Sequence, residues 1–206
     1  MIKLKGDSFD TLNTVTRGII RDSVPIIVPG VATGTLVTVP YNILVTGSLA
    51  AVDGLSAAGW GLQSDFGDGS FDINRSATFR SATLAAFAGK SPGYAGDPFG
   101  LYSATVRVQA GFAAPLDVEL SASAQTAFLN SSNESTSASF DLSQSLYWAR
   151  ISDVAVAGSS VASFTTIGES GTDYAHSFAP VPIPVTWVLF GSGLAGLVKR
   201  RRNPQT

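Results

Sequence analysis

Residues 116–124 decide the fold class, because apolar and polar side chains alternate there without interruption, as Leu116-Asp117-Val118-Glu119-Leu120-Ser121-Ala122-Ser123-Ala124. A β-strand points successive side chains to opposite faces, so a period of two is typical of a strand with one buried and one solvated face. Residues 104–110 repeat the pattern. Strands of this kind belong to antiparallel sheets that face water on one side.

The same pattern, in shorter pieces, extends over most of the chain. Further strands are expected at residues 33–39, 42–46, 76–84, 137–145, 147–156 and 161–166, separated by turns rich in Gly, Pro, Asn and Ser. We therefore predict an all-β body, an antiparallel β-sandwich or jelly roll, over residues 30–174. Residues 1–29 are expected to form a separate N-terminal segment, and residues 175–180 a linker.

Composition excludes several functional classes. Charged residues make up only 14% of the 206, the net charge is −2, and the chain has one His and no Cys. Nucleic-acid binding is not expected without a basic surface. The lack of Cys excludes disulfides, thiol catalysis and thiolate metal sites. A single His likewise excludes a site built from several His, and His176 is expected to be a solvated linker residue.

The C-terminus differs from the rest of the chain. An apolar run from Val185 to Val198 follows Pro184 and is succeeded by the basic residues Lys199, Arg200, Arg201 and Arg202. As a helix its fourteen residues would span about 21 Å, which is short for a bilayer core of about 30 Å. We predict a short transmembrane anchor; a buried helix at the chain end is the alternative. The predicted anchor residues include Val185, Trp187, Leu189, Phe190, Gly193, Leu194, Gly196 and Leu197.

The basic cluster also predicts an orientation. Lys and Arg next to a span stay on the cytoplasmic side, so the body is expected outside the inner membrane. Export needs a leader, and residues 1–10 contain no apolar signal core. Either the natural chain begins upstream of Met1 or the anchor interpretation is wrong; we favour the first.

This C-terminal segment resembles a known sorting signal. The motif Val181-Pro182-Ile183-Pro184, the apolar run and the basic end resemble the C-terminal domain of PEP-CTERM proteins of Gram-negative bacteria, in the variant class whose motif reads Val-Pro-Leu-Pro. The resemblance implies export, transient anchoring in the inner membrane and handling by an exosortase-type membrane protease. The product would reach the cell surface or an exopolysaccharide matrix. No agreed activity accompanies such bodies, so we expect a non-enzymatic one and no obligatory cofactor.

A cluster of carboxylates offers a calcium site. Asp65, Asp68 and Asp72 lie within eight residues and alternate with glycines. Calcium takes six to eight oxygen ligands, which such a loop can supply in part. The spacing does not match an EF-hand, and Asp-Gly is also a common hairpin turn.

Exposed aromatics would suit a carbohydrate-binding module. Trp60 and Trp148 are the main candidates for stacking on sugar rings, with Tyr94, Tyr102 and Tyr147 as possible partners. Packing inside the body is the alternative for each of them.

Two carboxylates on one strand suggest a third function. Asp117 and Glu119 lie on the same face of their strand, about 7 Å apart, which would suit an envelope hydrolase. The alternation already explains both as part of a solvated face. The order of preference is therefore a surface or matrix protein, a carbohydrate-binding module and a hydrolase.

Overall fold

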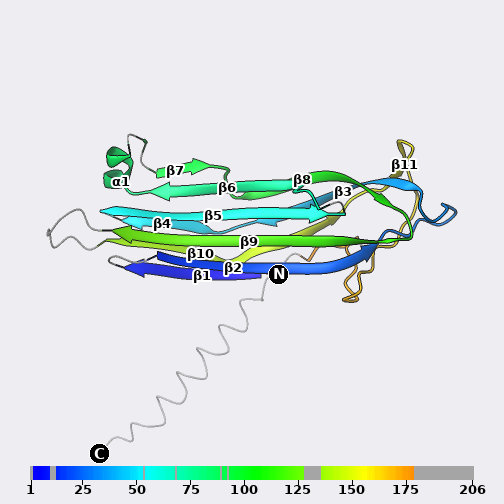
Figure 1. Cartoon of the computed structure of the whole chain (residues 1–206), viewed down its shortest axis with the longest axis horizontal. Helices are drawn as coiled ribbons and strands as arrows, with labels where there is room; N and C mark the ends of the chain where they lie inside the picture. The colour runs from blue at the N-terminus through cyan, green and yellow to red at the C-terminus, as the bar shows by residue number, and fades with distance from the viewer. Residues whose placement is uncertain are drawn as a thin grey trace, which may run out of the picture.

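The computed structural model describes residues 2–9, 13–52, 54–67, 69–88, 90–91, 93–127 and 136–178. They form an all-β body of two antiparallel sheets, as predicted (Figure 1). The first sheet contains β1 (Ile2–Phe9), β10 (Ser137–Ile151), β3 (Leu36–Val45), β4 (Ser48–Val52), β8 (Gly100–Gln109), β11 (Ala155–Val156) and β12 (Ser159–Ser160). The second contains, in spatial order, β2 (Asn13–Pro25), β9 (Ala113–Ala127), β5 (Leu55–Phe66), β6 (Ile73–Arg80) and β7 (Gly93–Gly96).

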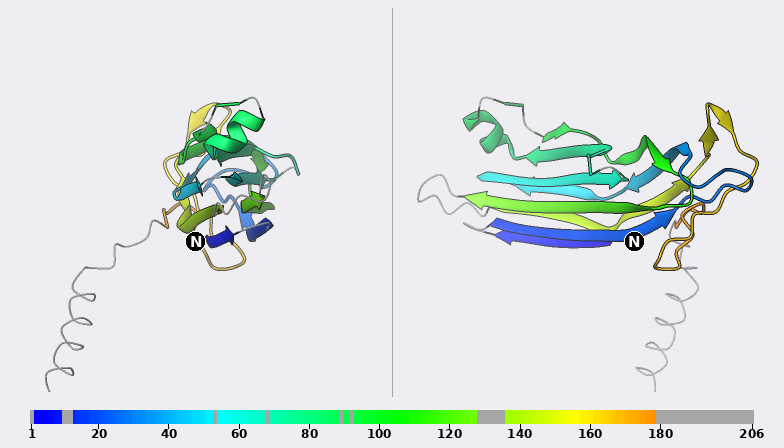
Figure 2. Two further views of the ribbon diagram at one scale, coloured as in Figure 1. Left: turned by 90° about the vertical axis from the view of Figure 1, so that its left-hand side faces the viewer. Right: turned by 45° about the vertical axis from the view of Figure 1, so that its right-hand side comes forward.

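The two sheets enclose one hydrophobic core, and the end-on view shows them as two layers (Figure 2). Strand β9 follows the alternation of its sequence. Leu116, Val118 and Leu120 are at most 2% exposed, while Asp117 and Glu119 lie on the outer face. Strand β5 does the same with Trp60, Leu62 and Phe66. Alternation thus identifies the buried face of the central strands.

Strand β3 is continuous through Pro40, although the sequence predicts two strands separated there. On one edge β3 pairs with β8 along its whole length. On the other edge it pairs with β10 up to Ile151 and with β11 from Ala155. Pro40 lies opposite this gap between β10 and β11, where its missing N–H interrupts no ladder.

Strand β10 is also continuous, where the sequence predicts a break at residue 146. Its first half pairs with β4 and its second half with β3, so β3 and β4 lie end to end along one neighbour. Gly47 lies in the two-residue connection between β3 and β4. A Cβ at this position would lie 2.7 Å from the carbonyl oxygen of Asp141, so only Gly allows the chain to pass this close to β10.

Two further strand predictions are corrected. The expected strand at 76–84 ends at Arg80 and is followed by the short helix α1 (Ala82–Phe87). Ser81 caps this helix, because its Oγ accepts a hydrogen bond from the N–H of Leu84 at 3.2 Å. The expected strand at 161–166 is an irregular segment, held by an isolated bridge between Thr165 and Ile27.

The expected boundary at residue 30 is wrong, because the N-terminal segment belongs to the body. Strand β1 pairs with β10, and β2 pairs with β9 over thirteen residues. Val24 and Ile26 have no exposed surface. At the other end, contacts with the body continue beyond residue 174 to Phe178, whose N–H bonds to the carbonyl oxygen of Trp148.

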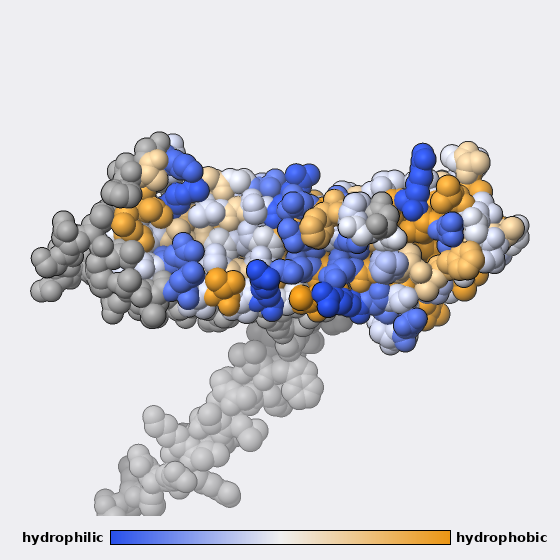
Figure 3. Space-filling model, in the orientation of Figure 1, coloured by the Kyte–Doolittle hydropathy of each residue, from blue (hydrophilic) through white to orange (hydrophobic). Residues whose placement is uncertain are grey.

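The surface of the body is uneven in hydropathy. Hydrophobic side chains gather at the end formed by the loops that follow β2 and β8 (Figure 3). Ile27, Leu36 and Phe112 are each at least 50% exposed there.

Candidate functional site

A cleft opens along one side of the body, where β2 extends beyond the first residue of β1. Strand β1 begins at Ile2, opposite Leu146 of β10, whereas β2 continues to Pro25. Beyond Ile2, the edge of β10 is covered by the segment 166–178, which we call the C-terminal loop. The N–H of Ile151 donates to the carbonyl oxygen of Tyr174 at 2.9 Å. A cleft of about 370 Å³ lies between β2 and this loop.

The cleft has an apolar floor and a polar rim. Both sheets form the floor, and its side chains from β9, β3 and β10 are at most 7% exposed. The floor consists of Ile20, Leu116 and Val118 from the second sheet and Ile43, Leu146 and Trp148 from the first. The rim consists of the polar residues Arg21, Asp22, Ser170, Thr172 and Tyr174, together with the aromatic ring of Phe178. Such an arrangement is typical of small-molecule sites.

Asp22 fastens the C-terminal loop to β2. Its Oδ2 accepts hydrogen bonds from Ser170 Oγ at 2.5 Å and Tyr174 Oη at 2.7 Å. Its Oδ1 accepts from the backbone N–H groups of Ser23 at 2.8 Å and Ser170 at 3.2 Å. Partial burial raises the pKa of Asp22, but these hydrogen bonds outweigh it and lower the pKa below the usual value. Four donors saturate this carboxylate, so its role is to hold the loop.

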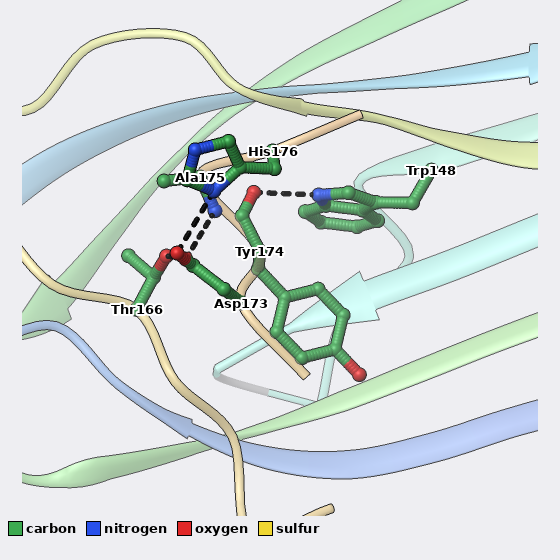
Figure 4. A network of polar contacts seen from close by, with 6 residues as sticks. All are labelled: Trp148, Thr166, Asp173, Tyr174, Ala175 and His176. Carbon is green, nitrogen blue, oxygen red and sulfur yellow. Dashed lines mark hydrogen bonds and ion pairs between the residues drawn. The ribbon is translucent and has the colours of Figure 1, made fainter. Parts of the chain in front are cut away.

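Trp148 joins the loop to the core. Its indole stacks on the ring of Tyr41, with centroids 5.4 Å apart and planes 4° apart. It also makes an edge contact with Tyr174 at 5.1 Å. The indole Nε1–H donates to the carbonyl oxygen of Tyr174 at 2.8 Å (Figure 4). Burial, followed by the hydrogen bond to ionised Asp22, raises the pKa of Tyr174 well above its usual range, so its hydroxyl stays a donor.

A second network stiffens the turn at residues 173–176. Asp173 accepts hydrogen bonds from the N–H of Ala175 at 3.0 Å and the hydroxyl of Thr166 at 3.2 Å. His176 Nδ1 lies 2.8 Å from Asp173 Oδ2 (Figure 4). The bond from Ala175, with smaller contributions from Thr166 and His176, lowers the pKa of Asp173 despite partial burial. His176 is exposed, as expected of a linker residue, but it is part of the folded loop.

The predicted exposed platform of Trp60 and Trp148 is not observed. Trp60 is 3% and Trp148 7% exposed, because each side chain points from its strand into the hydrophobic core. The two lie on opposite sides of this core, Trp60 against Tyr102 of β8 and Trp148 against Tyr174 of the C-terminal loop. Tyr147 is also buried, and within the described part of the chain its hydroxyl has no hydrogen-bond partner.

The structure does gather another set of aromatics around Trp60, which we call the Trp60 cluster. Trp60 stacks on Phe99 at 5.4 Å and contacts Tyr102 at 5.9 Å. Its Nε1–H donates to the hydroxyl of Tyr94 at 2.9 Å. Tyr94 is 41% exposed, so this predicted residue, and not either Trp, presents an aromatic ring to solvent.

The carboxylates considered for hydrolysis lie away from the cleft. Asp117 Oδ2 bonds to Arg21 Nε at 2.8 Å, and Glu119 Oε1 lies 3.5 Å from Arg17 Nε. Both pairs lie on the outer face of β9 and its neighbour β2. This placement fits the interpretation as a solvated face.

Two of the three candidate calcium ligands have roles in the turn after β5. Asp65 Oδ1 accepts the N–H of Gly69 at 3.1 Å. Asp72 turns toward the core, where its Oδ2 accepts the N–H of Phe66 at 2.8 Å and the hydroxyl of Tyr41 at 3.2 Å. Asp68 lies outside the described residues. The residues that the structure describes contain no cluster of three metal-binding side chains, and calcium here stays a prediction.

The predicted sorting motif, anchor and basic end, residues 181–202, also lie outside the described residues. Within the described ranges, no helix has the length and apolar character to cross a bilayer. No family model matches the chain, and no significant match exists among the curated proteins or the solved structures. The comparisons therefore offer no relative from which a function could be transferred.

Proposed function

We propose that the chain is a non-enzymatic surface or matrix protein of a Gram-negative bacterium, a jelly-roll-type β-sandwich exported on a C-terminal sorting segment. In this proposal an exosortase-type protease in the inner membrane handles residues 181–202. The body then reaches the cell surface or the exopolysaccharide matrix.

The observation that carries the proposal is the order of three features at the C-terminus. The motif Val181-Pro182-Ile183-Pro184 precedes the apolar run, and the basic residues 199–202 follow it. The fold is compatible with this order, since Phe178, three residues before the motif, still bonds to the body through the carbonyl oxygen of Trp148. A short apolar helix with a cytoplasmic basic end would hold the body on the outer side of the inner membrane.

Cell fractionation tests this proposal. An epitope tag inserted in the body should be cleaved by protease added to spheroplasts, and the chain should sediment with membranes. Replacing both Leu189 and Leu194 by Asp should release the chain from the membrane fraction, because charges at the centre of a span are costly. Leu36→Asp, at a side chain that is 59% exposed in the body, is the matched control and should change nothing. A tag that stays protected inside intact spheroplasts contradicts the proposal.

The Trp60 cluster supports carbohydrate binding as a second candidate function. Tyr94 exposes its ring beside Phe99, and a buried Trp60 holds its hydroxyl in place. Aromatic rings fixed in this way can stack on sugars with little loss of side-chain entropy. Tyr94→Ala should reduce retention on exopolysaccharide resin, whereas Phe71→Ala, at an aromatic residue that is 61% exposed elsewhere, should not. Equal retention of both variants would reject this function.

A further inference from the structure

We infer that the cleft between β2 and the C-terminal loop binds one acyl chain of a lipid. The inference goes beyond the proposed function and rests on it only for the membrane as the source of the lipid. Three properties of the cleft support it: the apolar side chains of the floor, the hydrogen bonds that already occupy Asp22 at the rim, and the position of the mouth close to the predicted anchor.

The floor suits a hydrocarbon chain. Ile20 and Val118 from one sheet and Leu146 from the other contribute aliphatic side chains. Trp148 adds an aromatic ring, whose one polar group, Nε1–H, already donates to the carbonyl oxygen of Tyr174. Two facing sheets lie about 10 Å apart, so a gap between them admits a single linear or flat group. Because an apolar cavity of about 150 Å³ takes up benzene, a cleft of this size has space for roughly a dozen carbon atoms.

The rim leaves a polar headgroup in water. Asp22 already accepts four hydrogen bonds from the chain itself, so it has no free position for a cationic ligand. Arg21 donates its Nε–H to Asp117 and is 71% exposed, so it lies at the edge of the cleft and not inside it. The apolar chain, more than its headgroup, would therefore provide the affinity.

The mouth lies close to the predicted anchor. Phe178 lines the cleft and is 39% exposed. The predicted anchor begins seven residues later at Val185, and seven residues span at most about 25 Å. An anchored body would therefore hold the mouth of the cleft near the bilayer surface, where acyl chains are the most abundant apolar ligand.

Quenching of Trp148 fluorescence by a brominated fatty acid tests the inference, because the indole of Trp148 lines the floor of the cleft. The full chain carries Trp60→Phe and Trp187→Phe, so that Trp148 is the reporter, and is reconstituted in phosphatidylcholine vesicles. Bromododecanoic acid should then quench Trp148 saturably. Ile20→Phe, which fills the cleft, should weaken this binding at least tenfold. Ile19→Phe is the matched control, because Ile19 is the neighbouring residue on β2, is 46% exposed and faces outward.

Quenching that does not saturate, or that is equal in Ile20→Phe and Ile19→Phe, overturns the inference. Circular dichroism checks that each variant folds, and Val118→Ile, a smaller addition to the same floor, replaces Ile20→Phe if that variant does not. Quenching that requires removal of residues 179–206 would identify the chain's own tail as the occupant, which also overturns it.

A second experiment, with vesicles made of brominated phosphatidylcholine, identifies the source of the acyl chain. Quenching by vesicle lipid assigns a membrane lipid, and quenching only by the added acid assigns a free fatty acid; both support an acyl chain as the ligand. Failure of the proposed function is seen separately, as a chain that does not remain with the vesicles.

Discussion

Two tryptophans close the two long sides of the body in different ways. Trp60 lies on the side of β7 and β8, where it packs against Phe99 and Tyr102 and bonds to a side chain, the hydroxyl of Tyr94. Trp148 lies on the side of β1 and β2, where it packs against Tyr41 and bonds to the backbone of the C-terminal loop.

This difference explains why the side of the body at Trp60 is filled, whereas the side at Trp148 contains a cleft. Around Trp60 the gap is filled by Tyr94 of β7, Tyr102 of β8 and Phe99 from the segment between these strands. Around Trp148 the C-terminal loop covers the edge of β10 that β1 does not reach, and hydrogen bonds to Asp22 fasten this loop to β2. A cleft remains because the loop contacts β2 at Asp22 and the first sheet at Trp148, which leaves a gap between them lined by Ile20, Val118 and Leu146.

The largest effect is expected at Trp148. Trp148→Ala should lower the free energy of unfolding by about 4 kcal/mol, because it removes a large side chain from the core. Trp148→Phe keeps the stacking but loses the hydrogen bond to Tyr174, and should free the C-terminal loop. Chymotrypsin should then cleave Trp148→Phe faster near Tyr174, while Trp60→Phe, the matched variant on the other side, is cleaved like wild type. Equal cleavage of both variants would refute the loop-fastening role.

The second largest effect is expected at Gly168. A Cβ here would clash with the carboxylate of Asp22 and lie 2.9 Å from the ring of Tyr174. Gly168→Ala should therefore cost about 2 kcal/mol of stability, as overpacking does. Gly100→Ala is the control, because the space around Gly100 is open. Urea denaturation measures both; similar midpoints for the two variants would contradict the close approach at Gly168.

A smaller, pH-dependent effect is expected at Asp22. Its pKa is lowered in the folded state, so its contribution to stability is present above the unfolded value of 3.8 and is lost as the pH falls below about 4. Asp22→Asn should lower stability at pH 7 by about 1–2 kcal/mol, through weaker hydrogen bonds. Thermal unfolding at pH 7 and pH 3 should show the gap between wild type and variant narrowing at the lower pH. If the difference in stability between wild type and Asp22→Asn were larger at pH 3 than at pH 7, the prediction would be wrong.

The smallest effect is expected at Tyr94. Tyr94→Phe removes the acceptor for the indole N–H of Trp60 but leaves the aromatic packing. Because Tyr94 is partly exposed, water can replace the lost hydroxyl, and the cost should be about 0.5–1 kcal/mol. The melting temperature measures it. A loss as large as that of Trp148→Phe, which also removes one hydrogen bond of an indole, would show that both sides depend equally on these bonds.

The central strands could be predicted from the sequence because their alternation reports burial directly. In residues 116–124 of β9 and 104–110 of β8 and its following turn, the apolar side chains of the alternating pattern are the ones that face the core. Strand β2 has the opposite pattern: Val15 and Ile19 are exposed, while Thr14, Thr16 and Gly18 lie on the inner side. The pattern therefore gave no indication that β2 belongs to the body.

The cleft could not be predicted, since it depends on contacts between distant parts of the chain. Asp22 and Tyr174 are 152 residues apart. One local signal exists: Asp22 is the carboxylate among the inward positions of β2, between Ile20 and Val24. It becomes informative only once the register of β2 is known.

The attachment of the C-terminal loop also has a mechanical consequence. Tension applied through the chain beyond Phe178 would load the hydrogen bond from Phe178 to Trp148 first, then those of Tyr174, and last the bridge between Thr165 and Ile27. These bonds would break one after another, so the loop would peel away while the sheets stay intact. An optical-trap experiment should record this as a small early extension before the body unfolds. A tethered molecule would thus uncover its cleft under load.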